Sequence, residues 1–494
     1  MRSLDTTAAL VDGVLEVLLQ ASRALTQPGG IAEALAAVAE VCASTIADYC
    51  SIGVVIEGLE REEFGVSAGE QPERQVPEVC RLMLPLVSGR RRYGAIICLT
   101  SDPSGFDSLS RRTIEVIAAQ LAVVVAAYSA AEREHQVAER LQRALLPPSF
   151  PKAEGCEFHA IYRPASEEAA VGGDWYDVFV LPDGRIAVSI GDVAGHGLDA
   201  AVVMGEVRQA VRTAGMREGV TPAEILEYVN DLVRARNSIG MVTAIFGVYD
   251  PQDSALIYAC AGHPPPMIAL SGGAVAILPG GGLPLGCAER VEAENWSFTI
   301  PQNGRAIFYT DGLTENERDV IAGERRLVDA VRSLEWNGDA DPAQAIAQHV
   351  LADTGNRDDA AVFVLTRRGP VDRYVFSAAT VVAPLSRAIV ANELAGLALS
   401  EDRRFGVLVA VGEAVANAVE HAYRGRAPGL IRLAVEKNAQ QLVVTVEDYG
   451  RWRPFVRREE RGRGIGIMHA FTDGVQIRST SESTAIVLRM ELPA

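Results

Sequence analysis

The sequence predicts a multidomain protein of the α/β and α+β classes, and three observations lead to this prediction. The 494 residues exceed one ordinary domain and suffice for about three. Hydrophobic residues make up 48% of the chain and charged residues 22%, so packed cores are expected. Apolar positions recur with helical spacing near the N-terminus, whereas short strand-like runs with turn signals dominate the middle.

The formal net charge of −18 argues against a general ligand of nucleic acids or anionic membranes, because both select for an excess of Lys and Arg. The N-terminal stretch carries acidic residues and no cleavage pattern, so no secretory signal is expected. The apolar run over 116–131 is shorter than the ~20 residues of a membrane span. Seven scattered cysteines without a C-x-x-C pair indicate reduced thiols. We therefore expect a cytoplasmic protein with no nucleic-acid or membrane partner.

Residues 8–130 are predicted to form an α/β unit with helices over 8–50, followed by strands. Its last helix is expected to begin near Phe106, with Asp107 or Ser110 as N-cap, and to end before Pro147. The part over 131–150 would serve as a linker helix. Four cysteines in or near this unit's apolar runs are interpreted as core residues rather than as a redox sensor: Cys42, Cys50, Cys80 and Cys98.

An apolar stripe follows the long helix, and it has two explanations of similar weight. The stripe could pack against its own domain, or it could form a parallel homodimer seam. Its members are Ile114, Ile117, Leu121, Val124, Tyr128, Val137, Leu141 and Leu145.

Residues 151–367 are predicted to form a domain dominated by β-structure, and four aspartates in it stand at expected strand ends. If the hairpin VFVLPDGRIAVSI turns between Asp183 and Gly184, Asp192 lies opposite Trp175 and beside Asp174. Asp311 follows the run RAIFYT, and Asp358 precedes AAVFVL. Such carboxylates are the ligands that Mg²⁺ and Mn²⁺ prefer, although each aspartate taken alone is also typical of an ordinary turn.

The ordered motifs of this region resemble the metal-dependent PPM-type serine/threonine phosphatases of the bacterial sporulation and stress-sigma-factor kind. The resemblance covers residues 137–366, including AERLQRALLPPSFP, which is similar to the linker helix of that family. It implies a PPM β-sandwich flanked by helices. The motifs are VGGDWYDVFVLPDGRIAVSIGDVAGHGLDAA, VTAIFGVYD, AGHPPP, GGLPLG, FYTDGLTE and RDDAAVFVL.

The same resemblance implies an active site with two Mn²⁺ or Mg²⁺ ions. It makes Asp192 the ligand that bridges both ions, with Asp174 and the carbonyl of Val193 completing one metal site. Asp311 and Asp358 would complete the other. The motif histidines His196 and His263 are interpreted as hydrogen-bonding loop residues rather than as ligands.

Residues 375–494, after a linker at 367–370, contain three further boxes. The segment FGVLVAVGEAVANAVEHAY places Glu413 and Asn417 on successive turns of one helix face. Taken alone, this helix is also explained as an ordinary helix with a polar surface. Asp448 ends the run VVTVED, and the run GRGIGI opens a helix whose N–H groups can face phosphates.

In this order the boxes resemble the anti-sigma-factor kinase branch of the ATPase superfamily of gyrase, Hsp90 and histidine kinases. The resemblance covers 375–493 and implies a histidine-kinase-type ATPase α/β sandwich that binds ATP with Mg²⁺. It makes Glu413 the catalytic base, Asn417 the Mg²⁺ ligand and Asp448 the residue that binds adenine. His135 is read as a solvated residue of the linker helix, since the whole central domain separates it from this unit. The implied nucleotide loops contain Gly450, Gly462, Gly464 and Gly466.

Residues 8–130 resemble a GAF sensor domain by the order of helices and strands. Together the resemblances imply a phosphatase that dephosphorylates a STAS-type anti-sigma-factor antagonist, with a C-terminal domain that acts as the opposing serine kinase or holds a sigma factor. Alternatively, the C-terminal domain is a non-catalytic module that binds the sigma factor or the antagonist. A third hypothesis, a generic metal-dependent hydrolase, leaves the ATP boxes without a role.

Overall fold

The protein, described by a computed structural model, divides into two compact units, Met1–Arg140 and Leu141–Ala494. The predicted site residues His196 and Gly462 lie outside the described residues. The structure describes 15–25, 30–57, 61–70, 79–164, 172–195, 197–236, 240–315, 319–334, 341–352, 358–371, 373–397, 399–423, 427–438, 440–450 and 463–492.

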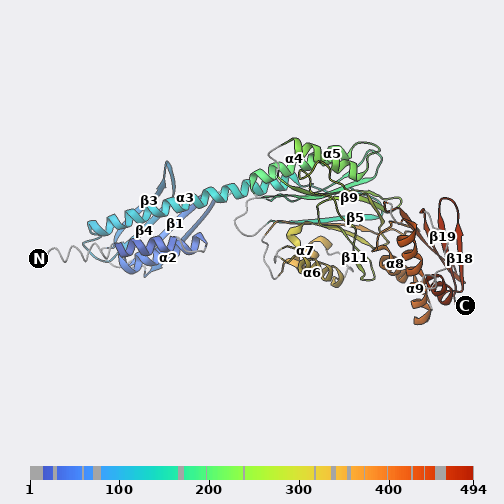
Figure 1. The fold of residues 1–494 in the computed structure, drawn as a ribbon. Helices are drawn as coiled ribbons and strands as arrows, with labels where there is room; N and C mark the ends of the chain where they lie inside the picture. The colour runs from blue at the N-terminus through green and yellow to red at the C-terminus, as the bar shows by residue number, and fades with distance from the viewer. Residues whose placement is uncertain are drawn as a thin grey trace. The chain divides into compact units, whose positions relative to one another are not determined.

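The first unit is a four-stranded antiparallel sheet in the order β2-β1-β4-β3, packed against helices (Figure 1). The sequence does not predict β2, because its first four residues, REEF, carry three charges. Cys42, Cys50 and Cys98 are buried in this core, as predicted, whereas Cys80 is half-buried. The elements are a helix over 15–25, α2 (Ile31–Thr45), β1 (Tyr49–Glu57), β2 (Arg61–Gly69), β3 (Cys80–Ser88), β4 (Arg91–Thr100) and α3 (Ser108–Leu145).

Helix α3 begins where the sequence predicts, because the Asp107 carboxylate accepts the Ser110 N–H at 2.6 Å. The first part of its apolar stripe, Ile114 to Leu121, is buried in the core of the first unit. Tyr128 and Val137 are 41% and 44% exposed. Packing within the first unit therefore explains the first half of the stripe, Leu145 at its end packs against a core of the second unit, and Tyr128 and Val137 are left exposed.

Two helical stretches are long and apolar enough to cross a membrane by length and composition alone, Ser108–Arg133 and Glu401–Ala422. Each also contributes buried residues to a core, such as Leu121 in the first and Val411 in the second. A core helix of a globular domain has the same two properties, so these helices are weak indicators of a membrane.

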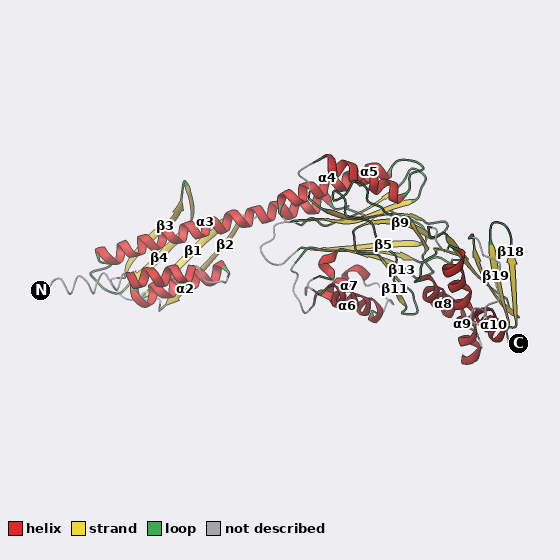
Figure 2. Ribbon diagram, viewed as in Figure 1, coloured by secondary structure: helices red, strands yellow, loops and turns green. Residues whose placement is uncertain are grey.

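The second unit begins with two facing sheets covered by helices on both outer sides (Figure 2). One sheet has the order β11-β10-β13-β14-β5 and is covered by α6 and α7. The other contains β12-β9-β8-β7-β6 and is covered by α4 and α5. The elements are β5 (Cys156–Arg163), β6 (Trp175–Val180), β7 (Ile186–Val193), α4 (Leu198–Gly215), α5 (Pro222–Ala235), β8 (Val242–Asp250), β9 (Ala255–Ala261), β10 (Met267–Ala269), β11 (Val275–Ile277), β12 (Trp296–Thr299), β13 (Arg305–Tyr309), α6 (Val320–Ser333), α7 (Pro342–Leu351) and β14 (Ala360–Arg367).

The β6–β7 hairpin differs by one residue from the predicted register. Trp175 lies opposite Gly191, not opposite Asp192. The loop holds three residues, closed by the Leu181 N–H bound to the Arg185 carbonyl, and Gly184 adopts a φ of 87°. A left-handed glycine in a three-residue loop centres the turn on Asp183 itself. As a consequence, Asp192 lies across from Asp174, one position beyond the last pair of the β6–β7 ladder, Trp175 and Gly191.

The remaining residues form a second pair of α and β layers. Their sheet is continuous with the sheet that contains β12-β9-β8-β7-β6, because β15 pairs with β12. Phe298 of β12 is opposite Phe376 of β15, so the sheet runs on in the order β15-β16-β17-β19-β18. Helix α9 buries Val407, Val411 and Ala414, the apolar face that the sequence predicts. The elements are β15 (Arg373–Ser377), α8 (Val382–Leu394), α9 (Glu401–Asn417), a π-helical turn (Ala418–Ala422), β16 (Leu430–Lys437), β17 (Gln441–Asp448), α10 (Arg463–Phe471), β18 (Gly474–Ser479) and β19 (Thr484–Glu491).

Candidate active site and nucleotide site

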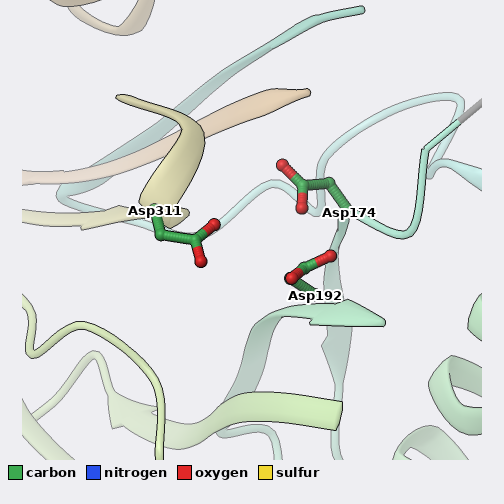
Figure 3. Close-up of side chains that lie close together, drawn as sticks. All are labelled: Asp174, Asp192 and Asp311. Carbon is green, nitrogen blue, oxygen red and sulfur yellow. The ribbon is translucent and has the colours of Figure 1, made fainter. Parts of the chain in front are cut away.

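Three of the four predicted aspartates meet at one end of the two facing sheets (Figure 3). Asp174 precedes β6, Asp192 lies near the end of β7, and Asp311 opens the short helical turn after β13. Ligand oxygens from these three carboxylates lie within 4.8 Å of one another. Oxygen donors at this spacing fit a hard divalent cation such as Mg²⁺ or Mn²⁺.

The absence of a side chain at Gly173 makes this approach possible. A Cβ atom there would stand 2.1 Å from the carbonyl oxygen of Val193 and 2.9 Å from the Oδ1 of Asp192. Val193 is the predicted backbone ligand, and its N–H donates to the Gly173 carbonyl at 3.2 Å. Gly173 thus brings the ends of β6 and β7 together around the carboxylates.

The three carboxyl groups have raised pKa values in the metal-free protein. Burial is the main cause for Asp174, followed by the charge of Asp192, and together they raise its pKa well above the usual value. Burial and the charge of Asp311 raise the pKa of Asp192 to about 7. Burial and the charge of Glu315 raise the pKa of Asp311. A cluster that resists ionisation without a counter-charge fits a cation site.

Asp358 is exposed and lies outside the group of three, yet its charge raises the pKa of both Asp192 and Asp311. Its neighbour Asp359 is buried instead and acts on Asp174 and Asp192. A Cβ atom on Gly172 would stand 1.4 Å from the Asp359 Oδ2, so this carboxylate lies directly against the chain that leads to Asp174.

The C-terminal boxes converge on the start of α10. Glu413 and Asn417 lie one turn apart near the end of α9, both half-buried. A Cβ atom on Gly464 would stand 2.9 Å from the Glu413 Oε2 and 3.4 Å from the Asn417 Nδ2. The first turn of α10, whose N–H groups favour phosphate, therefore lies beside a carboxylate and an amide.

Asp448 ends β17 and is buried, and its Oδ1 accepts the Gly450 N–H at 3.1 Å. Gly450 is in close contact with the π-helical turn, since a Cβ atom there would stand 2.2 Å from the Ala422 carbonyl oxygen. A Cβ atom on Gly466 would meet open space. The C-terminal part of the chain thus contains the buried acceptor Asp448, the predicted loop glycines Gly450 and Gly466, and the start of α10.

Comparisons with known proteins match two consecutive parts of the second unit. The family model of stage II sporulation protein E (SpoIIE) matches residues 182–368, and that of the histidine kinase-like ATPase domain matches residues 376–490. The anti-sigma F factor of Pasteuria penetrans is 33% identical over 115 residues, which are 21% of this chain and 77% of that protein. The chain joins a SpoIIE-type phosphatase domain to an anti-sigma-factor-type ATPase domain.

The phosphatase RsbU of Bacillus subtilis, described as a phosphoserine phosphatase, is 27% identical over 184 residues, which are 37% of this chain and 53% of RsbU. The crystal structure of the RsbU and RsbW domains of Rv1364c from Mycobacterium tuberculosis is 28% identical, with a TM-score of 0.39, and the match covers 70% of this chain and 98% of that one. The chain spans between about a third and about half the length of three curated relatives that it matches.

Two residues of these domains are missed by the sequence analysis. Asp359 of the phosphatase domain stands next to the predicted Asp358, and only the fold distinguishes the buried carboxylate from the exposed one. Thr484 of the ATPase domain is buried opposite Asp448 in the β17–β19 pair. In the sequence, Thr484 stands at the start of the apolar run TAIVLRMEL, and this position is the signal that could have identified it.

Proposed function

We propose that the SpoIIE-type domain is an active metal-dependent protein serine/threonine phosphatase, and the observation that carries this proposal is the acidic cluster. Three carboxylates that repel one another are held within 4.8 Å by separate strand ends. Such a cluster is stable with divalent cations and unfavourable without them. Mn²⁺ or Mg²⁺, when bound, supplies positive charge for a phosphoryl group and lowers the pKa of a water molecule.

Within this proposal each carboxylate has its own role. Asp192 would contribute to both ions, Asp174 and the Val193 carbonyl would hold one of them, and Asp311 with Asp358 would hold the other. Asp192 and Val193 lie on β7 and Asp174 directly precedes β6, so paired strands position these ligands.

The proposed substrate is a phosphoserine or phosphothreonine on a STAS-domain antagonist of an anti-sigma factor. Two kinds of relatives support this choice: a phosphoserine phosphatase, RsbU, and anti-sigma F factors. One chain that combines both types of domain fits a partner-switching pathway, in which phosphorylation of the antagonist decides whether the sigma factor is released.

For the ATPase domain we propose binding of ATP with Mg²⁺ and transfer of its terminal phosphoryl group to a serine hydroxyl of the antagonist. Glu413 would accept the proton of the attacking hydroxyl, and Asn417 would hold Mg²⁺. Asp448 and Thr484 would contact adenine, while Gly450, Gly462, Gly464 and Gly466 would border the phosphates. The alternative remains that this domain only binds the antagonist or the sigma factor.

For the first unit we propose a GAF-like sensor over 8–130, joined by a linker helix over 131–150 to the phosphatase at 151–367 and the ATPase at 375–494. The exposed Val137 on α3 supports a homodimer through the linker. We place the protein in the cytoplasm of a bacterium, because the relatives of its ATPase domain are bacterial anti-sigma F factors and sigma factors act inside the cell.

The direct test follows phosphate on a purified STAS antagonist. Asp192→Asn should lower Mn²⁺-dependent dephosphorylation by at least about 100-fold. Loss of a residue that only orients a metal ligand costs about 10- to 100-fold, and loss of the ligand itself should cost more. Asp183→Asn, the same change on the exposed turn of the same hairpin, should retain activity. Equal activity of the two variants would refute the metal assignment.

A second assay decides between kinase and binding module. With unphosphorylated antagonist and Mg-ATP, Glu413→Gln should abolish phosphoryl transfer and retain nucleotide binding if the domain is a kinase. If the wild-type chain transfers no phosphate but binds the antagonist, the binding-module alternative is correct.

A further inference from the structure

Beneath the acidic cluster, a set of buried polar side chains links the strands that carry the three aspartates. Thr310 directly precedes Asp311 and is fully buried. Its hydroxyl accepts the Ala361 N–H at 2.8 Å and donates to the Asp174 Oδ2 at 2.7 Å. One side chain between β13 and β14 therefore fixes an oxygen of a carboxylate on the opposite sheet.

The donor and the acceptor of each Thr310 hydrogen bond follow from the groups involved. A backbone N–H can only donate, so the Thr310 oxygen accepts from Ala361. The single hydroxyl proton is then directed to Asp174. Removing this hydroxyl would leave a buried amide and a buried carboxylate oxygen each short of one partner.

His263 forms the second link. Its Nε2 lies 3.1 Å from the Tyr309 carbonyl oxygen, and its Nδ1 lies 2.7 Å from the Thr243 Oγ1. A carbonyl can only accept, so Nε2 carries the proton and Nδ1 accepts the Thr243 hydroxyl. The ring is neutral, since burial lowers its pKa to about 3.

The two links reach all three aspartates. Thr243 of β8 is the direct neighbour of Asp192 in the β7–β8 pair. Tyr309 and Thr310 lead directly into Asp311. Thr310 itself binds Asp174. Within the described residues, these hydrogen bonds, the β7–β8 pairing and the consecutive residues Tyr309 to Asp311 connect the three carboxylates.

We propose that Thr310 and His263 are positioning residues that hold Asp174, Asp192 and Asp311 at the spacing required for divalent cations. This inference rests on the proposed metal-dependent phosphatase. It assigns His263 a role behind the ligands, in agreement with its interpretation as a hydrogen-bonding residue rather than a ligand. Residues that orient metal ligands typically contribute about 10- to 100-fold to metal affinity or activity.

The experiment measures Mn²⁺ affinity of the full chain by electron paramagnetic resonance of the free ion, without substrate. Thr310→Val should weaken Mn²⁺ binding by about 10- to 100-fold, whereas Thr310→Ser, which keeps the hydroxyl, should remain near wild type. In the phosphatase assay at saturating Mn²⁺, Thr310→Val should lower kcat more than it raises KM, because the substrate contacts are unchanged.

A matched control is Thr366→Val on β14. Thr366 is as buried as Thr310, and its hydroxyl has no hydrogen-bond partner among the described residues. This variant should bind Mn²⁺ as wild type does. Thr243→Val, a β-branched exchange on β8, provides an independent measurement at the His263 link and should weaken Mn²⁺ binding several-fold.

Each outcome decides a different question. Mn²⁺ binding by Thr310→Val and Thr243→Val equal to wild type would overturn the positioning roles. Equal losses in Thr310→Val and Thr310→Ser would also overturn them, because the hydroxyl would then be irrelevant. If Thr310→Val does not fold, Thr243→Val alone decides. A wild-type chain that binds no Mn²⁺ would instead refute the proposed phosphatase itself.

Discussion

Gly173 shows at the scale of one residue how the acidic cluster depends on a missing side chain. The ends of β6 and β7 approach so closely that a Cβ atom there would overlap the Val193 carbonyl. Glycine is required here by the space available and not by an unusual backbone angle. Gly173 belongs to the Gly-Gly-Asp motif of the sequence, so a close backbone approach can be predicted there, although the atoms in contact cannot.

Gly173→Ala should therefore displace Val193 and Asp192 while leaving the rest of the fold intact. A displacement of about 1 Å at a reacting centre can lower the rate by about 100-fold, and we expect a loss of that order in Mn²⁺-dependent phosphatase activity. Gly53→Ala, where a Cβ atom meets open space, is the control. Full activity of Gly173→Ala would show that the close approach has no catalytic role.

The raised pKa values of the cluster predict how stability depends on pH. In the metal-free protein the pKa of Asp192 is about 7, above its usual value of 3.8, so the folded state binds more protons than the unfolded state between these values. This group therefore lowers the free energy of unfolding as the pH rises from about 4 to about 7. Asp174 and Asp311 shift in the same direction.

Divalent cations should reverse this effect, because they compete with protons for the same oxygens. We expect Mn²⁺ to raise the melting temperature at pH 8 and to have little effect at pH 5. Thermal denaturation with and without Mn²⁺ at both pH values measures the difference, and Asp192→Asn should reduce it. A stabilisation by Mn²⁺ that is independent of pH would contradict the assignment of the raised pKa values.

At the scale of elements, the β6–β7 hairpin marks the limit of prediction from sequence. Alternation and the Asp-Gly turn identify both strands, but the register depends on whether the loop contains two or three residues. The hydrogen bond from the Leu181 N–H to the Arg185 carbonyl shows that it contains three, and the Asp-Gly pair alone does not specify this closure. The same holds for Asp358 and Asp359, which are adjacent in sequence and differ only in which one the fold buries.

An ion pair that the sequence does not predict connects helix α4 to this hairpin. Asp177 of β6 is buried, and its carboxylate accepts from the Arg212 Nη1 at 2.9 and 3.0 Å, with the Arg208 Nη1 at 3.6 Å. The Arg212 guanidinium also lies over the ring of Phe179, 4.6 Å from its centre. The two arginines are one turn apart on α4, so this contact fixes the helix on the sheet.

Asp177→Asn should lower the free energy of unfolding by about 2 kcal/mol, since it leaves two arginines facing a buried amide, with partial relief because Arg212 reaches solvent. Asp183→Asn removes an exposed ion pair with Arg185 on the same hairpin and should cost less than about 1 kcal/mol. Chemical denaturation of both variants measures the difference. Equal stabilities would mean that α4 is held by apolar packing alone.

At the scale of the whole molecule, the sequence defines the phosphatase and ATPase domains by their ordered motifs, yet it gives no sign that they share a sheet. Phe298 of β12 is fully buried, with its ring 5.9 Å from that of Phe376 and 6.4 Å from that of Tyr258. The hydroxyl of Thr299 accepts the Val375 N–H at 2.9 Å. Edge pairing of this kind depends on tertiary contacts and leaves no periodic signal.

A shared sheet predicts that the second unit unfolds in one cooperative transition. Mg-ATP, which binds the ATPase domain in our proposal, should then raise the melting temperature of the phosphatase strands as well. Phe298→Ala, which creates a cavity at the junction, should cost about 3–5 kcal/mol and separate the two transitions. Calorimetry distinguishes this from two independent transitions in the wild-type chain, which would contradict a common core.

The central claim is that Asp174, Asp192 and Asp311 form a two-metal site. Anomalous diffraction from crystals grown with Mn²⁺ tests it most directly, because it locates the ions without reference to activity. We expect two manganese peaks within ligand distance of these carboxylates, with Asp192 between them. Crystals grown with Mn²⁺ that show no manganese peak at this cluster would contradict the account.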